Sequence, residues 1–251
     1  MAEPYYKIKE PHEFLSYYLN AYKSEYRQQR ALKIIQLFPN LNGKKVLDLG
    51  CGGGFYSGAA CKKNCNDIVC LDISSVRVKA AMLNLRKNGH LKIEGIVADA
   101  TALPFRENCF DFIMCIDVIE HVKEDFKLLF EARRVLGNHG NFVVATQNCR
   151  SLNYIIEVPL QRYIIGNRRW MGWDSTHLRF YTPKSLVSLL MNSGFSVIKV
   201  AGTYFVPYML ATRIEFIYLL MKLMNKVCEE ATNAWWKIFG WGIIILAEKG
   251  S

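Results

Sequence analysis

Apolar and polar positions along the chain predict strands and helices that alternate. Short apolar runs, several of which end in an acidic residue, are separated by longer stretches whose apolar residues recur at helical spacing. The expected strands are 46–48, 67–72, 92–98, 109–116, 140–146, 196–203 and 240–248. The expected helices between them are 75–88, 126–136 and 186–192. This order is typical of an α/β fold, so the sequence predicts a seven-stranded, mostly parallel sheet with helices on both faces.

Acidic residues follow four of the expected strands. They are Asp48, Asp72, Asp99 and Asp117. In a parallel sheet the carboxyl ends of the strands meet at one edge, and ligands bind there near the switch point in strand order. Four unpaired carboxylates at one edge would be costly to the fold. A ligand with many hydrogen-bond donors and a positive centre would remove that cost, so the acids predict a binding site for such a ligand.

A glycine-rich turn follows the first strand, in the run VLDLGCGGG at residues 46–54. Glycine lacks a Cβ, so this backbone can adopt positive φ and approach a ligand closely. Phosphate-binding glycine loops hold an anion, which the carboxylate of Asp48 would repel. Dinucleotide-binding loops have the order Gly-x-Gly-x-x-Gly and their first acid at the second strand. Phe55 stands where that order needs a glycine, so a cationic or polyhydroxyl ligand fits better.

Residues 46–146 resemble a class I S-adenosylmethionine-dependent methyltransferase, nearest in style to the small-molecule methyltransferases of ubiquinone and menaquinone biosynthesis. The segments that carry the resemblance are VLDLGCGGG (46–54), VCLDIS (69–74), VADATALPF (97–105), FDFIMCIDVIEHV (110–122) and RRVLGNHGNFVVAT (133–146). The resemblance implies the Rossmann-like version of the α/β fold, with S-adenosyl-L-methionine as cofactor. One departure is GNHG at 137–140, where the family usually has Pro-Gly-Gly. A turn before a strand is expected either way.

The resemblance also assigns residues to the cofactor. The first strand and glycine turn would line its methionine part, Asp72 would accept hydrogen bonds from the ribose hydroxyls, and Asp99 with Ala100 would meet the adenine edge. The full set of predicted cofactor-binding residues is Asp48, Gly50, Cys51, Gly52, Asp72, Ile73, Asp99, Ala100 and Asp117.

An N-terminal helical cap is expected over residues 1–38, before a methyltransferase domain at 39–251. The cap has an apolar stripe at helical spacing, made of Phe14, Leu15, Tyr18, Leu19 and Tyr22. The stripe either packs on the core, which we favour, or forms a lid. Arg27 and Arg30 could reach the carboxylate of the cofactor, but solvated arginines are the favoured interpretation.

Two long inserts, at 147–177 and 204–240, follow the fifth and sixth strands. Connections of this length in a compact domain are usually functional. Both are aromatic, aliphatic and basic, and both leave the sheet at the predicted cofactor edge, so they are expected to form a cap over an apolar pocket with cationic residues around it. The helix expected at 216–224 is apolar on nearly every face but too short and too charged to span a bilayer. Burial under the other insert is favoured over contact with a membrane.

Composition sets the outer limits. The chain has 251 residues, a net charge of +10 and eight cysteines. The charge favours an anionic partner or surface, although many basic enzymes bind no polyanion. Cys61 and Cys65 have no second cysteine or histidine pair at ligand spacing, so no metal is expected. The polar start of the sequence shows no signal peptide, and we expect a cytoplasmic protein, with a peripheral membrane location as an alternative.

The predicted reaction is an in-line displacement that moves a methyl group to a hydrophobic or amphipathic small molecule, with O-methylation favoured. A hydroxyl acceptor needs a base, and His177 is the candidate because imidazole titrates near neutrality. His177 could instead brace the adjacent helix, and His121 is expected to be structural or to act through a neighbouring residue. A protein or RNA methyltransferase is an alternative that the charge allows, although a nucleic-acid partner is not favoured. A cofactor-binding adapter without turnover is the other alternative.

Overall fold

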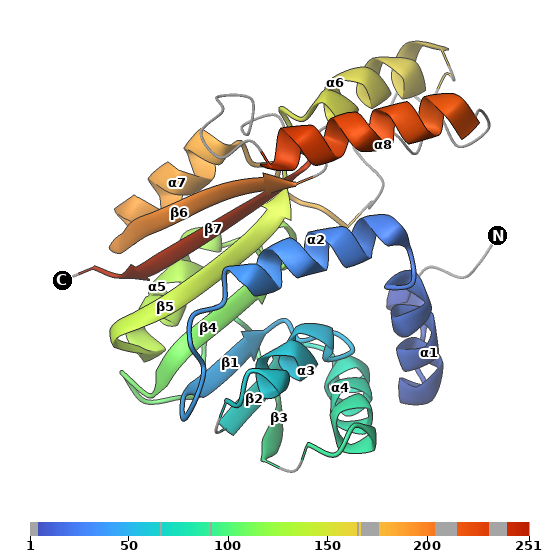
Figure 1. Ribbon diagram of the computed structural model, residues 1–251. Helices are drawn as coiled ribbons and strands as arrows, with labels where there is room; N and C mark the ends of the chain where they lie inside the picture. The colour runs from blue at the N-terminus through green and yellow to red at the C-terminus, as the bar shows by residue number, and fades with distance from the viewer. Residues whose placement is uncertain are drawn as a thin grey trace.

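A seven-stranded sheet forms the centre of the computed structural model (Figure 1). The structure describes residues 5–65, 67–90, 92–164, 166, 176–203, 215–230 and 240–250. The strands are β1 (Lys45–Leu49), β2 (Asp67–Asp72), β3 (Ile93–Val97), β4 (Phe110–Ile116), β5 (Leu136–Gln147), β6 (Phe195–Thr203) and β7 (Gly242–Lys249). The predicted Rossmann-like α/β fold is therefore confirmed.

The strand order is β3-β2-β1-β4-β5-β7-β6. Strands β1 to β5 pair in parallel with their neighbours, whereas β7 is antiparallel to both β5 and β6. The order reverses between β1 and β4, since the chain moves outward from β1 to β3 and then returns to the other side of β1. The carboxyl ends of β1 and β4 therefore form the switch point at which ligands of such sheets bind.

Helices cover both faces of the sheet. Alternate residues of each inner strand point to opposite sides: Val46 belongs to one core cluster, and Leu47 belongs to the other. Helices α5 (Asp125–Val135) and α7 (Pro183–Asn192) pack on the face that contains Leu47. Helices α2 (Glu25–Gln36) and α3 (Phe55–Lys62) pack on the face that contains Val46. The remaining elements are the 3-10 turns η1 (Tyr5–Lys7) and η2 (Ile119–His121), the π-helical turn η3 (Leu160–Ile164), and helices α1 (Pro11–Ala21), α4 (Ser75–Lys87), α6 (Leu152–Pro159) and α8 (Glu215–Glu230).

Local sequence signals set two boundaries. Thr182 caps α7 through a capping box with Ser185, and Pro183 occupies the first helical position. The segment at 137–140 falls inside β5, but the pairing with β4 jumps from Leu136 to Asn141, so these residues leave the ladder. His139 has a left-handed backbone there, with φ of 60°. A turn thus precedes the regular part of β5, as predicted.

The prediction that 216–224 is buried under the other insert is wrong. This segment lies in α8, and Phe216, Leu219 and Leu223 are each at least 60% exposed. Among the described helices, none is long and apolar enough to cross a membrane. Much of both inserts, at 167–175, 204–214 and 231–239, lies outside the described residues. The predicted cap formed by the inserts therefore stays a prediction.

Candidate functional site

The end of β1 brings a buried carboxylate and a glycine turn together. Asp48 is buried, and it accepts a hydrogen bond of 2.5 Å from the hydroxyl of Ser57 on α3. Burial raises the pKa of Asp48 to about 6, and this hydrogen bond opposes the shift. The turn has positive φ at Gly50 and Gly52. A Cβ at Gly50 would lie 2.2 Å from Cγ2 of Val118, so the turn needs glycine both for its backbone angles and for space.

The second strand ends in a carboxylate that the backbone holds in place. Asp72 is buried and accepts hydrogen bonds from the amides of Gly52, at 3.3 Å, and Ser74, at 3.0 Å. A guanidinium nitrogen of Arg77 lies 3.8 Å from one of its oxygens. Asp72 therefore has a fixed orientation, with remaining acceptor capacity towards the cavity that it lines.

Two adjoining cavities open at the switch point. Their volumes are about 240 Å³ and about 430 Å³, and together they fall within the range of about 300–1,000 Å³ typical of ligand sites. They share Gly50, Arg77, Asp117 and His121 in their walls. The predicted residues of the smaller cavity are Asp48, Gly50, Cys51, Gly52, Asp117 and His177. Those of the larger cavity are Gly50, Asp72, Ile73, Asp99, Ala100 and Asp117. The structure thus brings all ten predicted site residues to these cavities, while their roles stay predictions.

Helix α1 covers the glycine turn. The ring of Tyr18 lies so close to the turn that a Cβ at Gly53 would come within 2.3 Å of its Cδ1. Phe14, Tyr18 and Tyr22 all line the smaller cavity. The favoured interpretation of the apolar stripe, packing on the core alone, is therefore incomplete, because these three residues also form a wall of the site.

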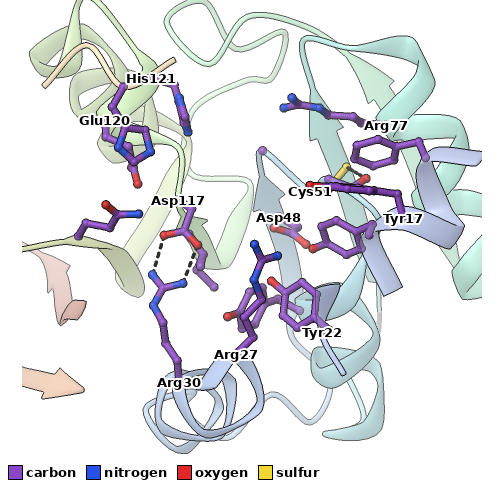
Figure 2. Close-up of a pocket in the computed structure, with 18 of the residues that line it drawn as sticks. Tyr17, Tyr22, Arg27, Arg30, Asp48, Cys51, Arg77, Asp117, Glu120 and His121 are labelled. Carbon is purple, nitrogen blue, oxygen red and sulfur yellow. Dashed lines mark hydrogen bonds and ion pairs between the residues drawn. The ribbon is translucent and has the colours of Figure 1, made fainter. Parts of the chain in front are cut away.

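Arg30 makes an ion pair inside the site. Its guanidinium donates two hydrogen bonds of 2.6 Å to the carboxylate of Asp117, and both are drawn as dashed lines in Figure 2. Burial alone would lower the pKa of Arg30, but the charge of Asp117 raises it well above its usual value. The prediction of a solvated Arg30 is wrong, since the side chain is buried. Arg27 lies next to Arg30 on the same face of α2. In Figure 2 the guanidinium of Arg27 points into the cavity.

An acid and two histidines meet beside Asp117. The ligand-type atoms of Glu120, His121 and His177 all lie within 4.8 Å of one another, a spacing at which they could hold one metal ion. Burial, aided by the charge of Asp117, raises the pKa of Glu120 to about 8. Nδ1 of His121 lies 3.1 Å from the hydroxyl of Thr176 and 3.2 Å from its carbonyl oxygen. Residue spacing in the sequence does not indicate this cluster, because its members come from two distant segments.

Several wall residues were not predicted from the sequence. In the smaller cavity, the aromatic and basic ones are Tyr17, Tyr26, Tyr56, Arg77 and Trp241. Tyr17 lies next to the apolar stripe of α1, and Arg77 lies on the helix that follows Asp72. Helical periodicity could have indicated the faces of α1 and α4, but not that those faces turn towards the glycine loop.

Comparisons with known proteins agree with this geometry. Residues 47–144 match the family model described as "Methyltransferase domain". A ubiquinone biosynthesis O-methyltransferase of Psychrobacter arcticus is 27% identical over 187 residues, covering 72% of this chain and 71% of that protein. An uncharacterised protein of Methanocaldococcus jannaschii is 33% identical over 209 residues, covering 82% and 80%.

Solved structures share the fold. The crystal structure of a SAM-dependent methyltransferase from Aquifex aeolicus superposes with a TM-score of 0.60 at 16% identity. The match covers 96% of this chain and 99% of that one. At this identity the likeness concerns the arrangement of helices and strands alone.

Proposed function

The chain belongs to the class I S-adenosylmethionine-dependent methyltransferases, and from this membership we propose that it methylates a hydrophobic or amphipathic small molecule, with oxygen as the favoured acceptor atom. The observation that carries the proposal is that His177 shares a cavity wall with Asp48 and the glycine turn. The curated relative from Psychrobacter arcticus is named as an O-methyltransferase of ubiquinone biosynthesis. That name supports an acceptor of the same chemical class.

The residues of the two cavities fit the cofactor. Asp72 offers a buried acceptor for ribose hydroxyls, and Gly50 and Gly52 keep the turn free of side chains where a Cβ would fill the space. Arg27 offers a cation for the carboxylate of the methionine part. Asp48 would supply negative charge for a sulfonium centre or an ammonium group, whereas the charge of Asp117 is already paired with Arg30. When bound, S-adenosylmethionine supplies an activated methyl group for in-line displacement.

The protein positions the reactants, excludes water from the site and provides a proton acceptor. Tyr18 covers the glycine turn and Tyr22 lines the same cavity, which limits the access of water to the reacting atoms. His177 would take the proton that an acceptor hydroxyl loses, since a neutral imidazole is a base near pH 7. His121 lies against His177, with ring centroids 4.8 Å apart. The contact of His121 with Thr176 supports a role for His121 in orienting its neighbour.

The acceptor class is tested by isotope transfer. A cell extract is separated into lipid and aqueous fractions, and each is incubated with the protein and S-adenosylmethionine carrying a deuterated methyl group. We expect mass spectrometry to find the labelled methyl in a molecule of the lipid fraction, attached through oxygen. Label that enters only protein, RNA or a polar soluble molecule would contradict the proposed acceptor. Cofactor binding without any labelled product would support the adapter alternative.

The role of His177 is tested by substitution. General base catalysis typically raises kcat by a factor of roughly 10²–10⁴. His177→Ala should therefore lower kcat by that factor and leave the Kd for the cofactor unchanged. A matched control is His139→Asn. His139 lies near the start of β5, whereas the cavity lies at the end of that strand, and asparagine tolerates the left-handed backbone found at His139. A His177→Ala protein with near-normal kcat would assign the residue to bracing alone.

A further inference from the structure

Helix α8 has its polar face turned towards the protein. The hydroxyl of Tyr218 donates a 2.8 Å hydrogen bond to Glu25 at the start of α2, and the ammonium of Lys222 pairs with the same carboxylate. Asn225, one turn further along, is buried. Residues 218, 222 and 225 lie on one face of a helix. The contacts with Glu25 therefore fix which face of α8 points inward.

The opposite face of α8 is apolar and open. Phe216 is 77% exposed, and Leu219 and Leu223 are each 60% exposed. All the large apolar residues exposed on this helix are Phe216, Ile217, Leu219, Leu220, Leu223, Met224 and Val227. A helix on the surface of a globular protein normally turns its apolar face towards the core and its polar face towards water, which is the reverse of α8. An exposed apolar patch of this extent is typical of a surface that binds another protein or a membrane.

A second group of exposed apolar side chains belongs to the first insert. Ile155 and Ile156 on α6, and Tyr163 and Ile164 on η3, are all exposed. Figure 1 draws α6 and α8 at the same end of the molecule, beyond the carboxyl ends of β5 and β6. Two separate connections of the sheet thus carry exposed apolar side chains at the end of the molecule that holds the cavities.

We propose that the outer face of α8, together with α6 and η3, docks on an anionic membrane surface. The charge of the chain selects this occupant, because a net charge of +10 is attracted to anionic lipids and opposes contact with a second copy. In the described parts of the inserts, the basic residues Arg150, Arg162, Lys222 and Lys226 equal the glutamates in number, and Lys222 pairs with Glu25, so the attraction comes from the charge of the whole molecule.

The docked helix would lie in the plane of the interface. Its apolar side chains would enter the boundary between headgroups and acyl chains, and basic side chains would contact the lipid phosphates. This inference goes beyond the proposed reaction and does not depend on the identity of the acceptor. It would give an apolar acceptor a short path from the lipid to the cavities.

Vesicle flotation tests the proposal with the full chain. Vesicles of phosphatidylcholine are compared with vesicles that also contain phosphatidylglycerol, at about 50 mM and about 500 mM salt, across which screening removes most surface electrostatics. We expect flotation with the anionic vesicles at low salt and less at high salt or with neutral vesicles. Leu219→Glu/Leu223→Glu should reduce the bound fraction at least about tenfold, because it removes two apolar anchors and adds repulsion.

A matched control keeps the result interpretable. Phe126→Glu/Phe130→Glu changes a pair at the same spacing on α5, where the side chains are 51% and 57% exposed, and it should float as the wild type does. Calorimetric binding of S-adenosylhomocysteine shows that each variant is folded. Absence of flotation by the wild type, or equal loss in both double variants, would overturn the proposal. So would a wild-type dimer that fails to float and that Leu219→Glu/Leu223→Glu converts to a monomer, because α8 would then join two copies.

Discussion

The burial of Asp48 lowers the stability of the folded protein at neutral pH. Burial raises its pKa to about 6. Between about pH 4 and pH 6, Asp48 therefore keeps a proton in the folded protein but has lost it in the unfolded chain. The free energy of unfolding therefore falls as pH rises through this range and stays lower above it. A buried carboxylate retained under these conditions, in the wall of a cavity, indicates a functional rather than a structural use.

The first prediction follows from that cost. Asp48→Asn keeps an acceptor for the hydroxyl of Ser57 but has no charge to bury, so it should stabilise the protein on the order of 2 kcal/mol at pH 7.5. The gain should shrink towards pH 4.5. Urea unfolding at several pH values measures it, and Glu94→Gln, which removes an exposed carboxylate on β3, serves as control. A gain that does not vary with pH would show that Asp48 is not ionised at a cost.

The pair Arg30–Asp117 joins α2 to the end of β4 and supports a second prediction. Both hydrogen bonds are charged and only part of the carboxylate meets solvent, so a double-mutant cycle with Arg30→Leu and Asp117→Asn should give a coupling energy of about 1–3 kcal/mol. The exposed pair Lys127–Glu124, at 3.8 Å, should give about 0.5 kcal/mol or less. Equal coupling energies for the two pairs would mean that the buried contact contributes nothing beyond a surface ion pair.

At the scale of elements, α1 is held on the glycine turn by the fit of Tyr18 against Gly53. A Cβ at Gly53 would collide with the ring, so Gly53→Ala should displace α1. Amide exchange over residues 11–21 should then become faster, and the affinity for S-adenosylhomocysteine should fall. Hydrogen-exchange mass spectrometry and calorimetry make the two measurements.

Two further variants separate the collision from other effects of Gly53→Ala. Gly58→Ala adds a methyl group that meets only ordinary contact, 3.7 Å from Leu85, and it should leave α1 unchanged. In a Tyr18→Ala background the ring is absent, so adding Gly53→Ala should cause little further change. A Gly53→Ala effect of equal size in both backgrounds would contradict the proposed contact.

The strands and the helices between them could be predicted because each carries a local signal. Apolar runs ending in Asp48, Asp72 and Asp117 indicate the strands, and Thr182 with Pro183 indicates the start of α7. The outer face of α8 could not be predicted in this way. Its apolar residues have the composition of a buried helix, and only the contacts of Tyr218 and Lys222 with Glu25 show which face turns inward.

The whole molecule combines residues that no local pattern connects. The glycine turn and the strand-end acids were found because they lie within short motifs. The roles of Arg30, Glu120 and the ring of Tyr18 were not, because they depend on contacts across long stretches of sequence: Arg30 and Asp117 are 87 positions apart. The sequence thus predicted the part of the site contributed by the sheet, and the structure adds the wall contributed by α1 and α2.

The most direct test of the account is calorimetric titration of S-adenosylhomocysteine into the wild type, Asp72→Asn and Asp67→Asn. Asp72 and Asp67 stand at opposite ends of β2, so the two variants remove the same charge from the same strand. Loss of a charged acceptor should cost about 1.5–3 kcal/mol, or roughly a tenfold to 150-fold weaker Kd for Asp72→Asn. Asp67→Asn should bind as the wild type does. A wild type that does not bind, or an Asp72→Asn protein of unchanged affinity, would contradict the assignment of these cavities to the methyl donor.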